Sequence, residues 1–189
     1  MFYHASPVGR LSTLEPRVSN HGKPLIYLSS RRENVLVYLS NAVEKHCREQ
    51  GFSWNGPWYK WASYGFTRDG ILQLEEYYPN ATEETYKGVS GYLYQVEPAP
   101  VITRLKEIPD VYTSSQPLDT ARCEFIPDAY DALLEAEAMG QLVIRRYETL
   151  SEADRKWLQK MIPQEYAKAE NHPEYRCFLQ SKFAFWIPC

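Results

Sequence analysis

Apolar positions recur at helical spacing in one stretch of the N-terminal half. After Ser29 and Ser30, apolar residues fall one, three or four positions apart, with polar residues between them: Val35, Leu36, Leu39, Ala42, Val43 and Cys47. This spacing predicts one amphipathic helix that ends before Gly51. Ser29 or Ser30 is a suitable N-cap, because a serine hydroxyl accepts a hydrogen bond from a free first-turn amide.

Other apolar runs are short and separated by turn residues, which is typical of strands. Strands are predicted at residues 2–5, 25–28, 71–78 and 89–97, with two more in the segments DVYTSS and CEFI. The sequence TRDG at 67–70 predicts a hairpin turn. Residues 80–87 favour a short helix that ends at Gly88.

From Asp128 the pattern becomes helix, strand and helix, the last stopped by Pro163. Because strands and helices do not alternate regularly, the expected fold class is α+β. We expect one domain over residues 1–189, with a strand-rich part at 1–127 and a helix-strand-helix part at 128–189. The apolar end, FLQSKFAFWIPC, is expected to dock on the body as a strand.

Composition narrows the function classes. The 189 residues carry a formal charge of −3 and no run of Lys or Arg, so nothing indicates a nucleic-acid arm. No signal pattern or membrane-length apolar run appears, so we expect a cytoplasmic protein without membrane contact. The scattered cysteines and histidines show no metal-ligand spacing, so no metal site is predicted.

Common catalytic motifs such as GxSxG, the Walker loop and GxGxxG are missing, and nothing favours one of the four cysteines as a nucleophile. Two short motifs remain. Tyr3-His4-Ala5-Ser6 lies on the first strand, and Tyr27-Leu28-Ser29-Ser30 leads from the second strand into the helix. With a later glutamate, this order resembles the ADP-ribosyltransferase-like superfamily in its His-Tyr-Glu form, which includes poly-ADP-ribose polymerases and diphtheria-type toxins.

This resemblance implies a split pair of small antiparallel sheets with flanking helices and NAD, as a substrate, in the cleft between them. His4 would bind a ribose hydroxyl, Ser6 the nicotinamide carboxamide, and Tyr27 would stack on the nicotinamide ring. Ser29 and Arg31 are the other expected NAD contacts, Arg31 through the pyrophosphate.

In the family, a glutamate that opens a late strand stabilises the positive charge that develops on the ribose as nicotinamide leaves. Glu124, in CEFIPDAYD, is the first choice here, and Glu76 and Glu97 are the rivals. Spacing leaves the choice among them open. Ala5 stands where these enzymes often carry glycine.

The resemblance therefore predicts transfer of ADP-ribose from NAD to an acceptor that the sequence does not identify. The alternative is a non-enzymatic nucleotide- or protein-binding module of the same fold, whose aromatic segment, with Trp54, Trp58, Tyr59 and Trp61, would contact the partner. Phosphate transfer from a 2′-phosphorylated RNA to NAD ranks lower, because the chain is acidic and the family's basic phosphate-holding residues have no match.

Overall fold

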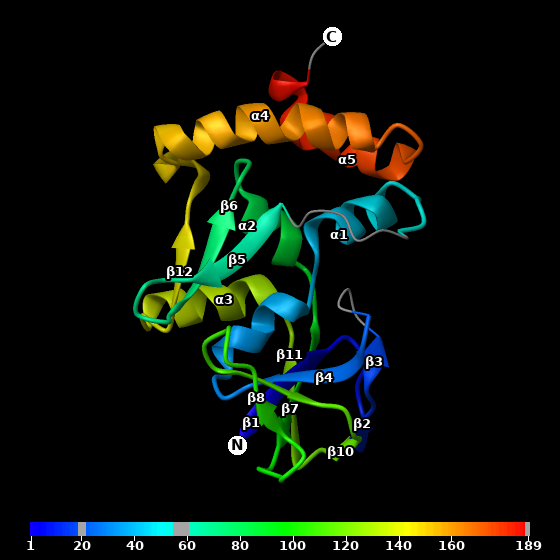
Figure 1. Cartoon of the computed structure of the whole chain (residues 1–189), viewed down its shortest axis with the longest axis vertical. Coiled ribbons are helices and arrows are strands. Elements are labelled where there is room, and N and C mark those ends of the chain that lie inside the picture. Colours follow the sequence, from blue (N-terminus) through cyan, green and yellow to red (C-terminus); the bar gives the residue numbers. More distant parts are fainter. Residues whose placement is uncertain (19–21, 55–60, 188–189) are drawn as a thin grey trace. The chain divides into compact units, whose positions relative to one another are not determined.

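The structure is a computed structural model that describes residues 1–18, 22–54 and 61–187. Its strands are β1 (Phe2–Ser6), β2 (Thr13–Leu14), β3 (Arg17–Val18), β4 (Pro24–Ser29), β5 (Ala62–Phe66), β6 (Leu72–Glu76), β7 (Gly91–Val96), β8 (Thr103–Arg104), β9 (Val111–Ser114), β10 (Leu118–Asp119), β11 (Arg122–Ile126) and β12 (Leu142–Arg145). The α-helices are α1 (Ala42–Glu49), α2 (Ala81–Tyr86), α3 (Ala129–Ala138), α4 (Glu152–Lys168) and α5 (Pro173–Phe183), and the 3-10 helices are η1 (Glu33–Tyr38), η2 (Tyr147–Thr149) and η3 (Ala184–Trp186). The α+β class is confirmed (Figure 1).

The chain forms two compact units. Unit 1 comprises Met1–Leu39, Phe66–Leu72 and Tyr86–Val143, and unit 2 comprises Ser40–Gly65, Gln73–Thr85 and Ile144–Cys189. Each unit is therefore assembled from three separate stretches of the sequence, and the two are described separately below.

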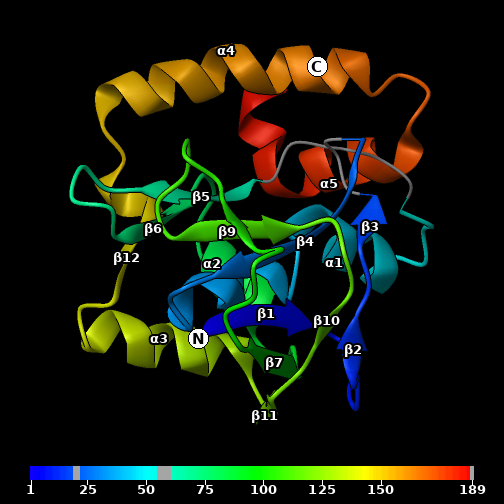
Figure 2. The same cartoon turned by 60° about the horizontal axis from the view of Figure 1, so that its bottom comes forward.

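Unit 1 is built on an antiparallel sheet in the order β11-β7-β1-β4-β9-β8, with β3 added to β4 (Figure 2). The β1–β7 pairing runs from Phe2↔Val96 to Ser6↔Tyr92, and the β4–β9 pairing from Ile26↔Ser114 to Ser29↔Val111. Among the described residues, β1 and β4 are joined by the single register pair Tyr3↔Ser29. The sheet therefore consists of two ladders with a narrow junction between its two central strands.

One face of this sheet carries a compact apolar core. Strand side chains alternate between the two faces of a sheet, and on this face Ile26 and Leu28 pack with Tyr94 and Val96. Leu14 of β2 and Leu118 of β10 complete the cluster, and these two short strands pair with each other. The buried apolar rows on both central strands explain why the sequence folds here as strands.

The other face lies against η1, which contacts β1, β4 and α3. The approach is close at Gly91 in β7, where a Cβ atom would lie 2.5 Å from Leu39 Cδ2. A side chain at position 91 would require the end of the Leu39 side chain to move, so the absence of a Cβ atom allows this close packing.

Unit 2 contains α1, α4, α5 and most of a three-stranded sheet in the order β12-β6-β5. α5 packs against α1 and α4 (Figure 1). The core of unit 2 is strongly aromatic, and its almost fully buried side chains include Trp61, Tyr175, Phe178 and Phe183. The high aromatic content of the sequence is thus used largely for packing in this unit.

The prediction of one helix after Ser29 and Ser30 is wrong, because the chain forms η1, a break at Ser40 and Asn41, and then α1. Asn41 is extended, and its Oδ1 accepts hydrogen bonds from Val43 N at 3.0 Å and Glu44 N at 3.2 Å. A strong N-cap at residue 41 starts a new helix there. The helical spacing of apolar residues therefore runs across the boundary between two helices.

Two further predictions are wrong in the C-terminal part. α4 continues through Pro163 to Lys168, which is possible because Ile162 before the proline and Glu165 and Ala169 after it remain buried. The final segment docks as predicted but as helix α5, whose buried Tyr175, Phe178 and Leu179 lie at helical spacing. Within the described ranges, no helix is both long and apolar enough to cross a bilayer.

Candidate functional site

The two motifs lie on neighbouring strands of unit 1 and are joined by a hydrogen bond. His4 Nδ1 lies 2.9 Å from the backbone carbonyl oxygen of Tyr27. A carbonyl only accepts hydrogen bonds, so Nδ1 must carry the proton and Nε2 is the unprotonated nitrogen. Burial is the main cause that lowers the pKa of His4 below its ordinary value, and the positive charge of Arg17 adds to it. At neutral pH the His4 ring is therefore a neutral acceptor at Nε2.

The strand register decides which side chains share a face. Tyr3 pairs with Ser29, so Tyr3, Tyr27 and Ser29 project from one face, and His4 belongs to the alternate set. Glu124 pairs with Leu93, which pairs with Ala5, so Glu124 shares the face of Tyr27. The structure therefore joins the His4 ring to the Tyr27 backbone, with the Tyr27 ring on the opposite face from His4.

Both motif serines form tight local turns at the ends of their strands. Ser6 Oγ accepts a hydrogen bond from Val8 N, and Ser29 Oγ accepts one from Arg31 N, each at 3.1 Å. Both residues are buried. One acceptor lone pair of each hydroxyl is thus used to end β1 and β4. Each hydroxyl proton is chemically able to donate to another group.

Glu124 lies on β11 and is held by Arg32. Its Oε2 accepts from Arg32 Nε at 2.9 Å, and its Oε1 accepts from Arg32 Nη2 at 2.5 Å. These hydrogen bonds are the largest cause that lowers the pKa of Glu124, and they also raise the pKa of Arg32. Glu124 is three strands away from Tyr27 in the sheet order, a separation of roughly 14 Å at the usual strand spacing.

The two rival glutamates lie elsewhere. Glu76 is buried in unit 2, where its Oε1 accepts from Thr82 N at 3.0 Å and its Oε2 from Tyr147 N at 3.3 Å. It fastens β6 to the segments that contain Thr82 and Tyr147. Glu97 follows β7 and is exposed. Neither residue lies beside Tyr27 in the described strand pairings.

A carboxylate that the sequence analysis missed, Asp110, lies beside the second motif. It directly precedes β9, the strand that pairs with β4. Its Oδ1 accepts from Ser30 Oγ at 3.1 Å, its carbonyl accepts from Ser30 N at 3.0 Å, and Arg31 Nε lies 3.6 Å from its Oδ2. The only local signal was an acidic residue just before the β-rich run VYTS, which is equally typical of a loop end.

An aromatic ring on η1 was also missed. Tyr38 ends η1, the element that follows the second motif, and 42% of its surface is exposed. The apolar spacing of this segment predicts a regular amphipathic helix and gives no signal that distinguishes the tyrosine. An exposed ring is able to offer a stacking face to a planar ligand.

The alternative function expects Trp61, in the aromatic segment, to contact a partner, but Trp61 is not available at the surface. This residue is fully buried in unit 2, and its Nε1 donates to Tyr175 OH at 2.9 Å. Trp54 packs against the same core and is partly exposed. Trp58 and Tyr59 lie outside the described residues.

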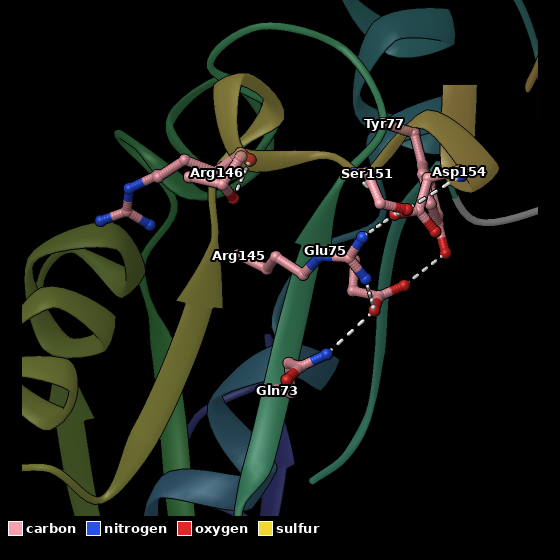
Figure 3. A network of polar contacts seen from close by, with 8 residues as sticks. Gln73, Glu75, Tyr77, Arg145, Arg146, Ser151 and Asp154 are labelled. Atoms are coloured by element: carbon pink, nitrogen blue, oxygen red, sulfur yellow. Dashed lines mark hydrogen bonds and ion pairs between the residues drawn. The ribbon is translucent and has the colours of Figure 1, made fainter.

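Unit 2 holds a second polar network, centred on Arg145 of β12 (Figure 3). Its guanidinium lies 3.0 Å from Glu75 Oε1 through Nη1 and is bonded to Asp154 through Nη2. Glu75 also accepts from Tyr77 OH at 2.5 Å, and Asp154 belongs to the capping box with Ser151 at the start of α4. The network ties two strands to a helix start, which gives Arg145 a structural role.

Comparison with protein-family models, with curated proteins and with solved structures finds no significant match to this chain. Among the described residues, no group of three or more His, Cys, Asp or Glu is arranged to hold a metal ion. The functional argument therefore depends on the chemistry of unit 1 and on the two motifs.

Proposed function

We propose that the protein is an NAD-binding ADP-ribosyltransferase-like protein that transfers ADP-ribose from NAD to an acceptor. The observation that carries the proposal is the hydrogen bond between His4 Nδ1 and the Tyr27 carbonyl, which links both motifs of the resemblance. It supports the expected role of His4, because a neutral ring with Nε2 as acceptor is suited to a ribose hydroxyl. The single register pair between β1 and β4 agrees with the split sheets that the resemblance implies.

For the aromatic contact, the resemblance points to Tyr27, with Tyr38 as a second candidate. The Tyr27 ring lies on the opposite face of the sheet from His4, so the aromatic contact is a separate part of the proposal from the His4 contact. Tyr27 belongs to the motif, and Tyr38 lies eleven residues further along and is partly exposed. A nicotinamide ring is flat and binds well against such faces. Ser6 and Ser29, which end the two motif strands, and Arg31 remain the expected polar contacts for NAD.

For the carboxylate, the geometry favours Asp110 over Glu124. Glu124 is held by a two-point contact with Arg32, and a carboxylate neutralised in this way stabilises positive charge poorly. Asp110 lies beside the second motif, and its nearest recorded cation, Arg31, is at 3.6 Å. We therefore assign to Asp110 the stabilisation of the charge that develops on the ribose carbon.

Calorimetry with NAD tests the binding proposal. The wild type is expected to bind NAD, and His4→Ala to bind it more weakly by about tenfold or more, because one buried hydrogen bond to the ligand is lost. His4→Asn preserves an N–H donor toward the Tyr27 carbonyl but removes Nε2. It therefore shows whether weaker binding comes from the lost contact with the ligand or from a disturbed strand. An absence of heat from the wild type at millimolar NAD would refute the proposal.

Nicotinamide release tests the assignment of the carboxylate. Asp110→Asn is expected to abolish release while NAD still binds, and Glu124→Gln to retain it. Ser30→Ala is the control, because it removes the hydrogen bond to Asp110 and leaves the carboxylate in place. If Glu124→Gln instead abolishes release, Glu124 carries the role, as first inferred from the sequence.

The second candidate function is a non-enzymatic binding module of the same fold. It is favoured by one observation, the placement of the His4 and Tyr27 side chains on opposite faces of the sheet. This function predicts NAD or nucleotide binding with no nicotinamide release in any variant, including the wild type.

A further inference from the structure

Unit 2 brings a cysteine and a histidine together at the contact between α1 and α5. Cys177 Sγ of α5 lies 3.8 Å from His46 Nε2 of α1. The His46 ring is buried and lies edge-on to Phe178, with ring centroids 5.5 Å apart. Burial and the contact with Phe178 therefore restrain the orientation of the imidazole toward the thiol.

The surroundings of His46 favour its neutral form. Burial is the largest cause that lowers its pKa below the ordinary value, and the charge of Lys182 lowers it further, while Glu49 and Glu84 act in the opposite direction. Lys182 is itself paired with Glu84 at 2.6 Å. A neutral imidazole is the form that accepts a proton from a thiol.

Two other described cysteines provide a built-in comparison. Cys47 follows His46 on α1, is fully buried, and has its pKa raised by that burial. Cys123 on β11 is exposed and lies opposite Tyr94 in the register. Cys177 is intermediate in exposure and, of these three, is the thiol with a recorded contact to an imidazole. Exposure alone would make Cys123 the most reactive.

We propose that Cys177 is a nucleophilic thiol, with His46 as its general base, and that it reacts with small uncharged electrophiles such as hydrogen peroxide. In the reaction, Cys177 Sγ attacks one peroxide oxygen, an S–O bond forms and the O–O bond breaks. The thiol proton passes to His46 Nε2 and then to the departing hydroxide, which leaves as water. Sulfur is oxidised by two electrons to a sulfenic acid, and the peroxide is reduced. This site is independent of the NAD proposal.

Competitive labelling of the reduced full chain tests the proposal. A small amount of iodoacetamide is added, the reaction is quenched, and peptide mass spectrometry compares Cys177, Cys123 and Cys47 in one sample. Cys177 is expected to react about tenfold faster than the more exposed Cys123, which is less than the roughly 10²–10⁴-fold usual for general-base assistance because the S···N contact is long. Cys47 is expected to remain unlabelled. With hydrogen peroxide and dimedone, the sulfenic acid adduct is expected at Cys177.

His46→Phe and His46→Gln examine the role of the imidazole, with circular dichroism as the check on folding. Either variant is expected to reduce the Cys177 rate to that of Cys123 or below and to leave the Cys123 rate unchanged. The proposal is overturned if Cys177 in the wild type is no faster than Cys123, a comparison that needs no variant. It is also overturned if a folded His46 variant retains the fast rate.

Discussion

At the scale of single residues, partners decide what each carboxylate is able to do. Glu76 binds two backbone amides, and Glu75 shares Arg145 with Asp154. Glu124 is bound by the two nitrogens of Arg32, although both side chains are more than a third exposed. An acidic residue in a suggestive sequence position is therefore a catalytic candidate only after its partners are known.

The Arg32–Glu124 pair predicts a pH-dependent loss of stability in Glu124→Gln. The folded pKa of Glu124 is lowered, so its stabilising contribution is complete above the ordinary glutamate pKa and is lost as pH falls through the folded value. At pH 7 the variant should be less stable by about 1 kcal/mol or less, because the pair is partly solvated. Urea denaturation at pH 7 and pH 3 measures the difference.

Glu97→Gln is the control for this experiment, since it removes the same charge from an exposed glutamate with no ion pair recorded in the described part of the chain. The free energy of unfolding of Glu97→Gln should differ little from that of the wild type at either pH. A Glu124→Gln effect of equal size at pH 7 and pH 3 would show that the ion pair is not its source.

At the scale of elements, short capping interactions place boundaries that apolar periodicity misses. Asn41 begins α1, after η1 has ended at Tyr38, within what reads as a continuous amphipathic pattern. Ser151 and Asp154 similarly begin α4 with a capping box, and that start was visible in the sequence as SEAD. The two cases differ because Asn41 lies inside the apolar period, whereas Ser151 lies outside it.

Asn41→Ala is expected to destabilise the protein by about 1 kcal/mol, because two first-turn amides lose their acceptor. Asn41→Asp preserves a carboxylate acceptor and should restore most of the loss. Chemical denaturation of the three proteins measures the effect. An equal loss in Asn41→Asp would indicate that packing of the amide, and not capping, sets the stability.

Local rules explain which elements were predicted. The hairpin around 67–70, α2, β7, β9, β11 and α3 all follow from turn residues, caps or alternation within a few residues. The sequence predicted that His4 and Tyr27 lie on two early strands, but it did not predict the hydrogen bond between them. The partners of Glu124 and Asp110 were not predictable, because Arg32 lies 92 residues from Glu124 and Ser30 lies 80 residues from Asp110.

At the scale of the whole molecule, the chain passes between the two units five times, at residues 39/40, 65/66, 72/73, 85/86 and 143/144. Three of these points fall within strands, so β5, β6 and β12 each have residues in both units. Unfolding one unit must therefore release strand ends that belong to the other. We expect a single cooperative transition.

Leu93→Ala tests this cooperativity. Leu93 is fully buried in unit 1, and its truncation should cost about 2–5 kcal/mol. All five tryptophans fall within the sequence ranges of unit 2, so their fluorescence reports on that unit alone. The variant is expected to shift the fluorescence and far-UV circular dichroism transitions together. Leu158→Ala in unit 2 is the matched control, and a fluorescence transition that stays in place in Leu93→Ala would show that the units unfold separately.

The interleaving of the two units also limits how such a protein is changed, both in the laboratory and over generations. No single cut in the gene yields either unit intact, because each needs three stretches that the other interrupts. A stop codon after residue 143 would remove the third stretch of unit 2 and leave its first two without their helical partners α4 and α5. Neither unit is therefore a portable module, and recombination that exchanges contiguous gene segments would disrupt both together.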